Sequence, residues 1–344
     1  MREVELTARQ RVILLRVVEE HVATGQPVGS KALVARSNVG VSSSTVRAEL
    51  AELEERGLLT HPHTSAGRVP TERGYRVYAD ELLDRLEPRA GEFPLDLDEG
   101  PGELELALQA TSERLSELTN LLALVSAPPL EATTVRHVEL LVLQPRLVMV
   151  VLITATGTVL KRTFSFREDV DAGLAGWARE YLNERVAGLR LGTHLLRQRF
   201  EDPGLAPRER EFLARLRPAF TDLIAEEQRL FVGGAAGLLD EVRAEEFRAY
   251  RTLVELLEER VRLLTVLRQA LHPTRPFVRV GSELDVRAAD ELALVGAGYG
   301  LVNRTLGAVS LLGPARMDYD HAIRSVHAAA RELSRLAEEV FAEN

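Results

Sequence analysis

The sequence predicts an α+β protein of several domains that begins with a winged helix-turn-helix. Its 344 residues exceed what one typical hydrophobic core organises, so two or three domains are expected. The first 86 residues carry signals for three helices, a short strand, a basic loop and a fourth helix. Beyond residue 130, runs rich in β-branched residues alternate with helical patterns.

The first two helices have recognisable ends. Thr7 and Gln10 fit a capping box, and Gly25 stands where a left-handed residue ends a helix. A turn at residues 27–29 leads to a short second helix over residues 30–36.

The third helix is expected to begin at the serines of positions 42–44 and to stop at Gly57. Residues 58–60 then read as a strand, residues 61–70 as a loop and residues 71–86 as a fourth helix. This order of elements is typical of a winged helix.

The third helix has the pattern of a recognition helix. Val46, Leu50 and Leu53 are spaced to face the core, which places Ser44, Arg47, Ala48, Ala51 and Glu55 on the opposite face. An arginine there can bind guanine, and an alanine can contact a thymine methyl. The glutamates at positions 49, 52, 54 and 55 would repel phosphate, so only the N-terminal end is expected to enter the major groove. Taken alone, the pattern also fits an ordinary amphipathic surface helix.

The loop after the strand favours the DNA-binding interpretation. Residues 63–68 read His-Thr-Ser-Ala-Gly-Arg and combine hydroxyls, a basic residue and a turn glycine, which is the chemistry of phosphate contact. His63 fits a surface loop equally well. The predicted DNA-binding residues are Lys31, Ser42, Ser43, Ser44, Thr45, Arg47, His63, Thr64, Ser65, Arg68, Tyr75 and Arg76.

The charge distribution is compatible with this prediction although the net charge is −9. Residues 1–86 hold 12 Lys/Arg and 12 Asp/Glu, whereas the remaining residues hold 31 and 40. The excess acid therefore lies outside the N-terminal region, and DNA affinity responds to the local patch.

Composition also indicates the compartment. The chain has no cysteine, which excludes disulfides and thiolate zinc sites, and no signal peptide is recognised. The longest apolar run, residues 147–153, is too short to span a membrane. We expect a cytoplasmic protein with no membrane partner.

An enzymatic function is not indicated. The motifs GxxxxGK(S/T), HExxH and GxSxG are absent, and the eight histidines are dispersed. Residues 294–300 resemble the start of a dinucleotide loop, but Leu301 stands where the third glycine belongs, so we predict a strand leading to a turn. No catalytic residue, metal or cofactor is expected.

The rest of the chain mixes helices and strands. Residues 87–102 read as a linker and residues 103–124 as a helix. Strands are predicted over residues 135–143, 147–153 and 158–166, with a helix over residues 170–186.

Helical patterns then dominate residues 194–268, chiefly 209–228 and 245–269, around a short strand at 231–232. An apolar stripe from Leu253 to Leu267 fits either packing inside one subunit or a subunit interface. Later strands are predicted at residues 277–281, 292–295 and 309–312, before a final helix capped by Asp318 or Asp320.

Several segments resemble the HrcA family of heat-inducible transcription repressors. The resemblance is carried by residues 6–10, 24–31, 41–47, 57–59, 61–71, 74–76, 230–239 and 313–319. These segments span nearly the whole chain, although residues 90–135 match only loosely.

The resemblance implies a function and an architecture. Such proteins are negative regulators of class I heat-shock operons, bind inverted-repeat operators in double-stranded DNA as homodimers, and are kept active by a GroEL-type chaperonin. Their fold is a winged helix followed by a GAF-like α/β sheet domain, which a mostly helical dimerisation domain interrupts. Applied here, it gives a winged-helix domain at 1–88, a GAF-like domain at 89–193 and 269–344, and an inserted dimerisation domain at 194–268.

Two alternatives remain open at this point. The GAF-like region could bind a small molecule that gates DNA binding, which a well-formed apolar pocket would favour. An enzyme with an auxiliary winged helix would require a converging set of titratable groups in a cleft.

Overall fold

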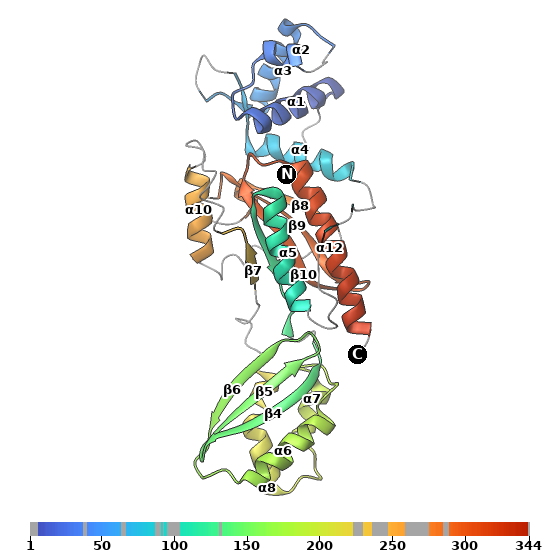
Figure 1. Cartoon of the computed structure of the whole chain (residues 1–344). Helices are drawn as coiled ribbons and strands as arrows, with labels where there is room; N and C mark the ends of the chain where they lie inside the picture. The colour runs from blue at the N-terminus through green and yellow to red at the C-terminus, as the bar shows by residue number, and fades with distance from the viewer. Residues whose placement is uncertain are drawn as a thin grey trace.

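The computed structural model combines helices with antiparallel sheets, which confirms the α+β class. Figure 1 shows three parts arranged end to end, which we call the N-terminal, central and distal lobes. The structure describes residues 6–36, 40–62, 67–86, 91, 93–94, 104–130, 133–222, 230–235, 247–258, 275–284 and 289–342.

The N-terminal lobe, residues 6–86, has the predicted helices and first strand, but the end of the predicted loop 61–70 forms a second strand. Its elements are α1 (Ala8–Thr24), α2 (Ser30–Arg36), α3 (Ser43–Glu55), β1 (Leu59–Thr60), β2 (Val69–Pro70) and α4 (Glu72–Asp84). Strands β1 and β2 pair antiparallel, and a bridge between Val28 and Arg68 adds a third segment to this small sheet.

The ends of these helices follow from local chemistry. Thr7 and Gln10 form the predicted capping box of α1, and Gly25 ends that helix in the left-handed conformation with φ 72°. Ser42 and Thr71 cap α3 and α4 through their side-chain oxygens.

The central lobe contains a five-stranded antiparallel sheet in the order β7-β3-β10-β9-β8. Its elements are α5 (Leu104–Thr119), β3 (Leu122–Ser126), β7 (Leu230–Gly233), α10 (Phe247–Glu258), β8 (Phe277–Val280), the 3-10 helix η5 (Gly281–Leu284), β9 (Leu292–Leu301), β10 (Arg304–Pro314) and α12 (Tyr319–Ala342).

Apolar side chains pack on both faces of this sheet. Side chains such as Val125, Val295 and Leu311 pack toward α5 and α12. The alternate residues, such as Leu124, Leu294 and Leu312, pack against α10 on the other face. Within the described part of the sheet, both faces are therefore closed by apolar packing.

The N-terminal part of the central lobe differs from the prediction. A single helix over residues 103–124 was expected, but α5 ends at Thr119 and residues 122–126 form β3. Asn120 has φ 53°, and this left-handed residue breaks the helix. The apolar spacing continued past that break and concealed it.

The distal lobe, residues 133–222, has a separate three-stranded antiparallel sheet in the order β4-β5-β6. Its elements are β4 (Val135–Gln144), β5 (Leu147–Thr154), β6 (Val159–Ser165), α6 (Ala172–Arg185), α7 (His194–Arg199), α8 (Pro207–Leu216) and α9 (Pro218–Thr221). The helix expected over residues 209–228 is interrupted at Pro218, which begins α9.

The distal lobe also has its own core. One face of the sheet packs against α6, α7, α8 and α9 through a cluster that runs from Val135 to Phe220. We expected the strands of residues 135–166 in the same sheet as the C-terminal strands, but they belong to this separate unit because their inner side chains pack on these helices. The boundary expected between residues 193 and 194 lies inside this core.

The apolar stripe of α10 packs within the subunit where the structure describes it. Leu253 and Leu256 are buried against the central sheet, and Leu257 packs beside them. The remaining stripe residues, Val261, Leu264 and Leu267, lie outside the described residues, as does most of the predicted linker 87–102. No described helix combines the length and apolar character needed to cross a bilayer.

Candidate nucleic-acid interface

The N-terminal end of α3 presents the predicted polar face. Val46, Leu50 and Leu53 are buried on one side of the helix, whereas Ser44 and Arg47 are exposed on the other, together with Ala48. Figure 1 shows α2 and α3 at the end of the N-terminal lobe that lies away from the central lobe. This face is therefore open to a large partner.

Hydroxyl groups cluster where α3 begins. The Ser42 hydroxyl accepts from the backbone N–H of Thr45 at 3.3 Å. It also lies 2.8 Å from the Ser44 hydroxyl and 3.0 Å from that of Thr45. Because these groups surround the positive end of the helix, they suit an anionic oxygen.

Ser43 has a different role from its neighbours. Its hydroxyl lies 3.0 Å from that of Ser30, which is buried at the start of α2. This contact joins α2 to α3, so Ser43 faces the interior and not the open surface.

Two basic side chains stand free at this end. Lys31 on α2 and Arg47 on α3 are both exposed, and within the described residues neither takes part in an ion pair. Other basic residues of the lobe are engaged: Arg9 contacts Glu49, and Arg36 contacts Glu20. Lys31 and Arg47 are therefore available to neutralise phosphate or to bind a base edge.

The glutamates of α3 are largely occupied by neighbours. Glu49 accepts from Arg9 at 3.4 Å, and Glu52 accepts from the side-chain amide of Gln10 at 2.6 Å. The same Gln10 side chain accepts from the backbone N–H of Thr7, so one buried residue both caps α1 and holds α3. The capping box predicted Gln10, but nothing in the sequence indicated its second contact.

Arg68 is placed differently from our expectation. Its side chain is only 16% exposed, and its guanidinium lies against Glu54 of α3, with Nη2–Oε2 2.9 Å. Its backbone pairs with Val28, and a Cβ on the preceding Gly67 would lie 2.5 Å from the Val28 carbonyl carbon. Arg68 thus fixes the base of the hairpin and does not point to the open surface. His61, which contacts the same carboxylate, is a further positioning residue that sequence reasoning missed.

Tyr75 and Arg76 lie away from the other predicted residues. Tyr75 is buried, and its ring centroid is 5.9 Å from that of Tyr319 in the central lobe. Arg76 donates to the carbonyl oxygen of Val278 and contacts Glu283. The expectation that these two residues hold DNA is therefore corrected, because α4 uses them to pack against the central lobe. His63, Thr64 and Ser65 lie outside the described residues.

Within the described residues, neither a dinucleotide loop nor a cluster of catalytic or metal-binding groups is found. The segment of residues 294–300 lies within β9, paired with β10 along its length, and the turn follows only after Leu301, as predicted. A cavity of about 300 Å³ is lined by residues 298–305 at the tip of that hairpin and is not enclosed by a cluster of titratable groups. Among the described residues, no three His, Asp or Glu side chains are grouped to hold a metal ion.

Comparisons with known proteins agree with the resemblance to the HrcA family. Residues 105–323 match the family model described as the HrcA protein C terminal domain. Proteins named heat-inducible transcription repressor HrcA are similar along the whole chain. That of Parafrankia sp. (strain EAN1pec) is 36% identical and that of Nocardioides sp. (strain ATCC BAA-499 / JS614) is 37% identical, each alignment covering 96% of this chain and 98% of the relative.

One solved structure shares the fold. The crystal structure of a hypothetical protein at 2.2 Å resolution superposes with a TM-score of 0.66 and 22% identity, and the alignment covers 98% of this chain and 100% of that one. At this identity the similarity concerns the fold alone.

Proposed function

Since the chain belongs to the HrcA family, whose named members are heat-inducible transcription repressors, we propose that it represses chaperone operons by binding an inverted-repeat operator as a homodimer. The N-terminal lobe acts in this proposal as a winged-helix DNA-binding domain. The observation that carries it is the exposed N-terminal end of α3, where free Arg47 lies beside a group of hydroxyls.

In the proposed complex, the N-terminal end of α3 enters the major groove. Arg47 and Ser44 contact base edges, while Lys31 and the Ser42 hydroxyl contact phosphate. Glu49, Glu52 and Glu54 do not oppose this approach strongly, because each has a donor from a neighbouring segment. The segment of His63, Thr64 and Ser65 is proposed to contact the backbone, on its sequence alone.

The distal lobe offers a surface for the second subunit. On the outer face of its sheet, β5 carries Leu147, Met149, Val151 and Ile153, which are half-buried although the described helices pack on the inner face. Figure 1 shows these helices on one side of the sheet. On the neighbouring strands Glu139 and Lys161 flank Val151, and the Glu139 carboxylate also accepts from Arg179 of α6 at 3.2 Å.

The row formed by Glu139, Val151 and Lys161 across the three strands can pair with a second copy of itself. A twofold axis parallel to β5 would place Val151 over its own copy and Glu139 over Lys161 of the partner subunit. The two ion pairs would then border an apolar strip, which is the usual arrangement of a homodimer interface. We propose that the distal lobes dimerise through this face and that the central lobe, GAF-like in the proposal, connects them to the DNA-binding domains.

The test is a mobility shift with the full-length protein on inverted-repeat operator DNA from a chaperone operon, with scrambled DNA of equal length as control. At moderate salt, we expect the protein to shift the operator but not the scrambled DNA, with two chains bound per operator. Equal affinity for both DNAs would contradict it. Modulation by a GroEL-type chaperonin is proposed from the family resemblance, and adding chaperonin to the same assay should increase the fraction of operator bound.

A further inference from the structure

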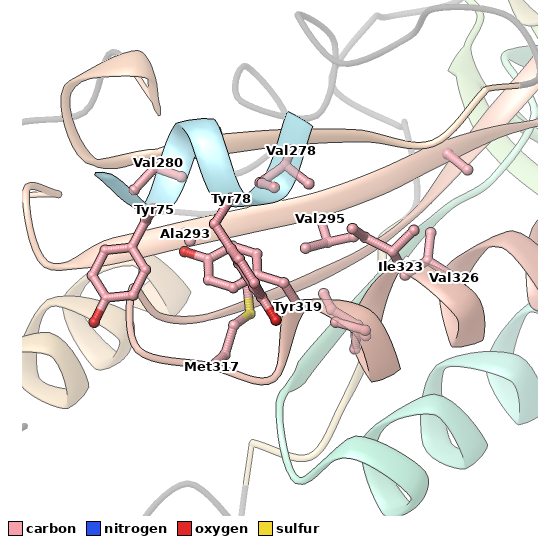
Figure 2. Packing of buried hydrophobic residues seen from close by; sticks show 14 of the residues in the cluster. Tyr75, Tyr78, Val278, Val280, Ala293, Val295, Met317, Tyr319, Ile323 and Val326 are labelled. Atoms are coloured by element: carbon pink, nitrogen blue, oxygen red, sulfur yellow. The ribbon is translucent and has the colours of Figure 1, made fainter. Parts of the chain in front are cut away.

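The N-terminal and central lobes share one hydrophobic core. Buried side chains from α1, α3 and α4 belong to the same continuous cluster as those of α5, β9 and α12. At the junction, Tyr75 and Tyr78 of α4 pack against Tyr319, with ring centroids 5.9 and 6.1 Å apart (Figure 2). Domains that move freely usually have separate cores, so this packing favours a fixed orientation.

Polar contacts border this junction on α4. The Glu72 carboxylate accepts from the backbone N–H of Ser282 at 3.2 Å and from its hydroxyl at 2.9 Å. Arg76, one turn further along α4, donates to the Val278 carbonyl oxygen and contacts Glu283 at 3.4 Å. These contacts are directional, so they define the angle between the lobes as well as holding them together.

Gly281 allows α4 to approach this closely. Its φ is +55°, and a Cβ at this position would lie 2.2 Å from Cδ of Glu72. A side chain here would both strain the backbone and displace the carboxylate.

A second attachment lies at the end of α1. Nη1 of Arg316, in the turn before α12, donates to the Val22 carbonyl oxygen at 3.4 Å. A Cβ on Gly25 would lie 2.7 Å from the same nitrogen. Two contacts on different helices restrict rotation of the lobe in a way that a single hinge would not.

We propose that Glu72, Arg76 and Arg316 are positioning residues that hold the DNA-reading lobe in one orientation and thereby restrict the half-site spacings that the dimer accepts. Each base pair added between half-sites moves one of them by roughly 3.4 Å and rotates it by roughly 34–36°. A dimer with fixed lobes cannot follow this change, whereas a dimer with loosened lobes can. The inference rests on the proposed DNA binding.

The first test uses DNA. The full-length protein and the variant Arg76→Ala/Arg316→Ala are titrated with operators whose spacer is shortened or lengthened by one to three base pairs. We expect the wild type to lose at least about tenfold in affinity when the spacer changes by two base pairs, and the variant to lose less than about threefold. Arg335→Ala is the control, because within the described residues this exposed arginine forms ion pairs with Glu332 and Glu339 of its own helix, far along α12 from α4. It should keep the wild-type preference.

The second test needs no DNA. Because the chain has no cysteine, Ala35→Cys on α2 and Glu338→Cys on α12 introduce the only thiols, and both positions are exposed. Labelled protein is mixed with an excess of unlabelled protein, so that distances between two subunits of a dimer do not contribute. Spin labels at these positions should then give one narrow intrasubunit distance distribution in the otherwise wild-type protein. The Arg76→Ala/Arg316→Ala substitutions should broaden it.

The two measurements separate the possible failures. A broad distribution in the wild-type background would overturn the inference, whether or not the variant folds. A narrow distribution in the folded variant together with an unchanged spacing preference would also overturn it. If the wild type shows a narrow distribution but binds no inverted repeat, the fixed orientation stands and the proposed function fails.

Discussion

Glu54 of α3 and Arg68 at the base of the β1–β2 hairpin form an ion pair, with 3.1 Å between Nε and Oε2 and 2.9 Å between Nη2 and Oε2. His61 reaches the other oxygen of the same carboxylate. The hairpin is thus aligned on the helix that we propose reads DNA. Arg68, which we expected to contact DNA phosphates, instead pairs with a carboxylate of its own chain.

Replacement of Glu54 by alanine should weaken both stability and operator binding. The substitution leaves the largely covered Arg68 guanidinium without its acceptor, so we expect a loss of about 1–2 kcal/mol in the free energy of unfolding. Denaturant unfolding and a mobility shift measure the two effects. Glu55→Ala removes the same charge from the exposed side of α3 and should change stability by less than about 0.5 kcal/mol. Equal effects of the two substitutions would refute the alignment role.

Arg47 and Lys31 should differ in how they affect DNA recognition. Arg47→Ala is expected to cost roughly 1–3 kcal/mol of operator affinity and to relax base preference at one position in each half-site. Lys31→Ala should weaken binding to all sequences and lower the salt slope by about one per subunit. Titrations at several salt concentrations, on operators substituted one base pair at a time, distinguish these outcomes. Unchanged affinity and base preference for Arg47→Ala would show that the helix is wrongly assigned.

A charge exchange tests the proposed dimer face. Lys161→Glu should weaken the dimer, because two like charges would then face each other across the twofold axis near Val151. Glu139→Lys should do the same, and the double exchange should restore association. Light scattering on a concentration series measures the dimer constant. If the double variant dimerises no more tightly than either single variant, Glu139 and Lys161 do not face each other across the interface.

Tyr319 should contribute to the stability of two lobes at once. It is 1% exposed, packs against Tyr75 and Tyr78, and donates its hydroxyl to the Ala315 carbonyl oxygen at 2.7 Å. Tyr319→Ala should cost about 3–5 kcal/mol, and Tyr319→Phe about 1 kcal/mol. Thermal unfolding should show the N-terminal and central lobes melting together in the wild type. Separate transitions for the two lobes in the wild type would mean that the shared core does not couple them.

Local signals predicted the helices of the N-terminal lobe well, because capping and turn chemistry act within a few residues. The box of Thr7 and Gln10, the left-handed Gly25 and the cap at Ser42 are all observed. The predicted strands near residues 135, 147 and 158 are also present. The expectation that residues 135–166 share a sheet with the C-terminal strands was wrong, since apolar alternation marks a buried face without identifying what packs on it.

The candidate site was predictable only where a residue's role depends on its own helix. Arg47 is exposed because Val46 and Leu50 fix the rotation of α3. Arg68 and Arg76 could not be placed in this way, because their partners Glu54 and Glu283 come from other segments. An arginine next to a turn glycine looks the same in the sequence whether it binds phosphate or a carboxylate of its own chain.

His327 should make the protein less stable in mild acid. It lies buried on α12, where burial, and secondarily the positive charge of Arg331, lower its pKa below the ordinary value of 6.5. The unfolded chain therefore takes up a proton at a higher pH than the folded chain, so stability falls as the pH drops below about 6.5. The difference in urea midpoint between the wild type and His327→Gln should be constant above neutral pH and should shift against the wild type as the pH falls below about 6.5, until the folded protein is protonated as well. His194→Gln changes an exposed histidine and should follow the wild type. A constant difference between the wild type and His327→Gln at all pH values would mean that His327 contributes by packing and not by titration.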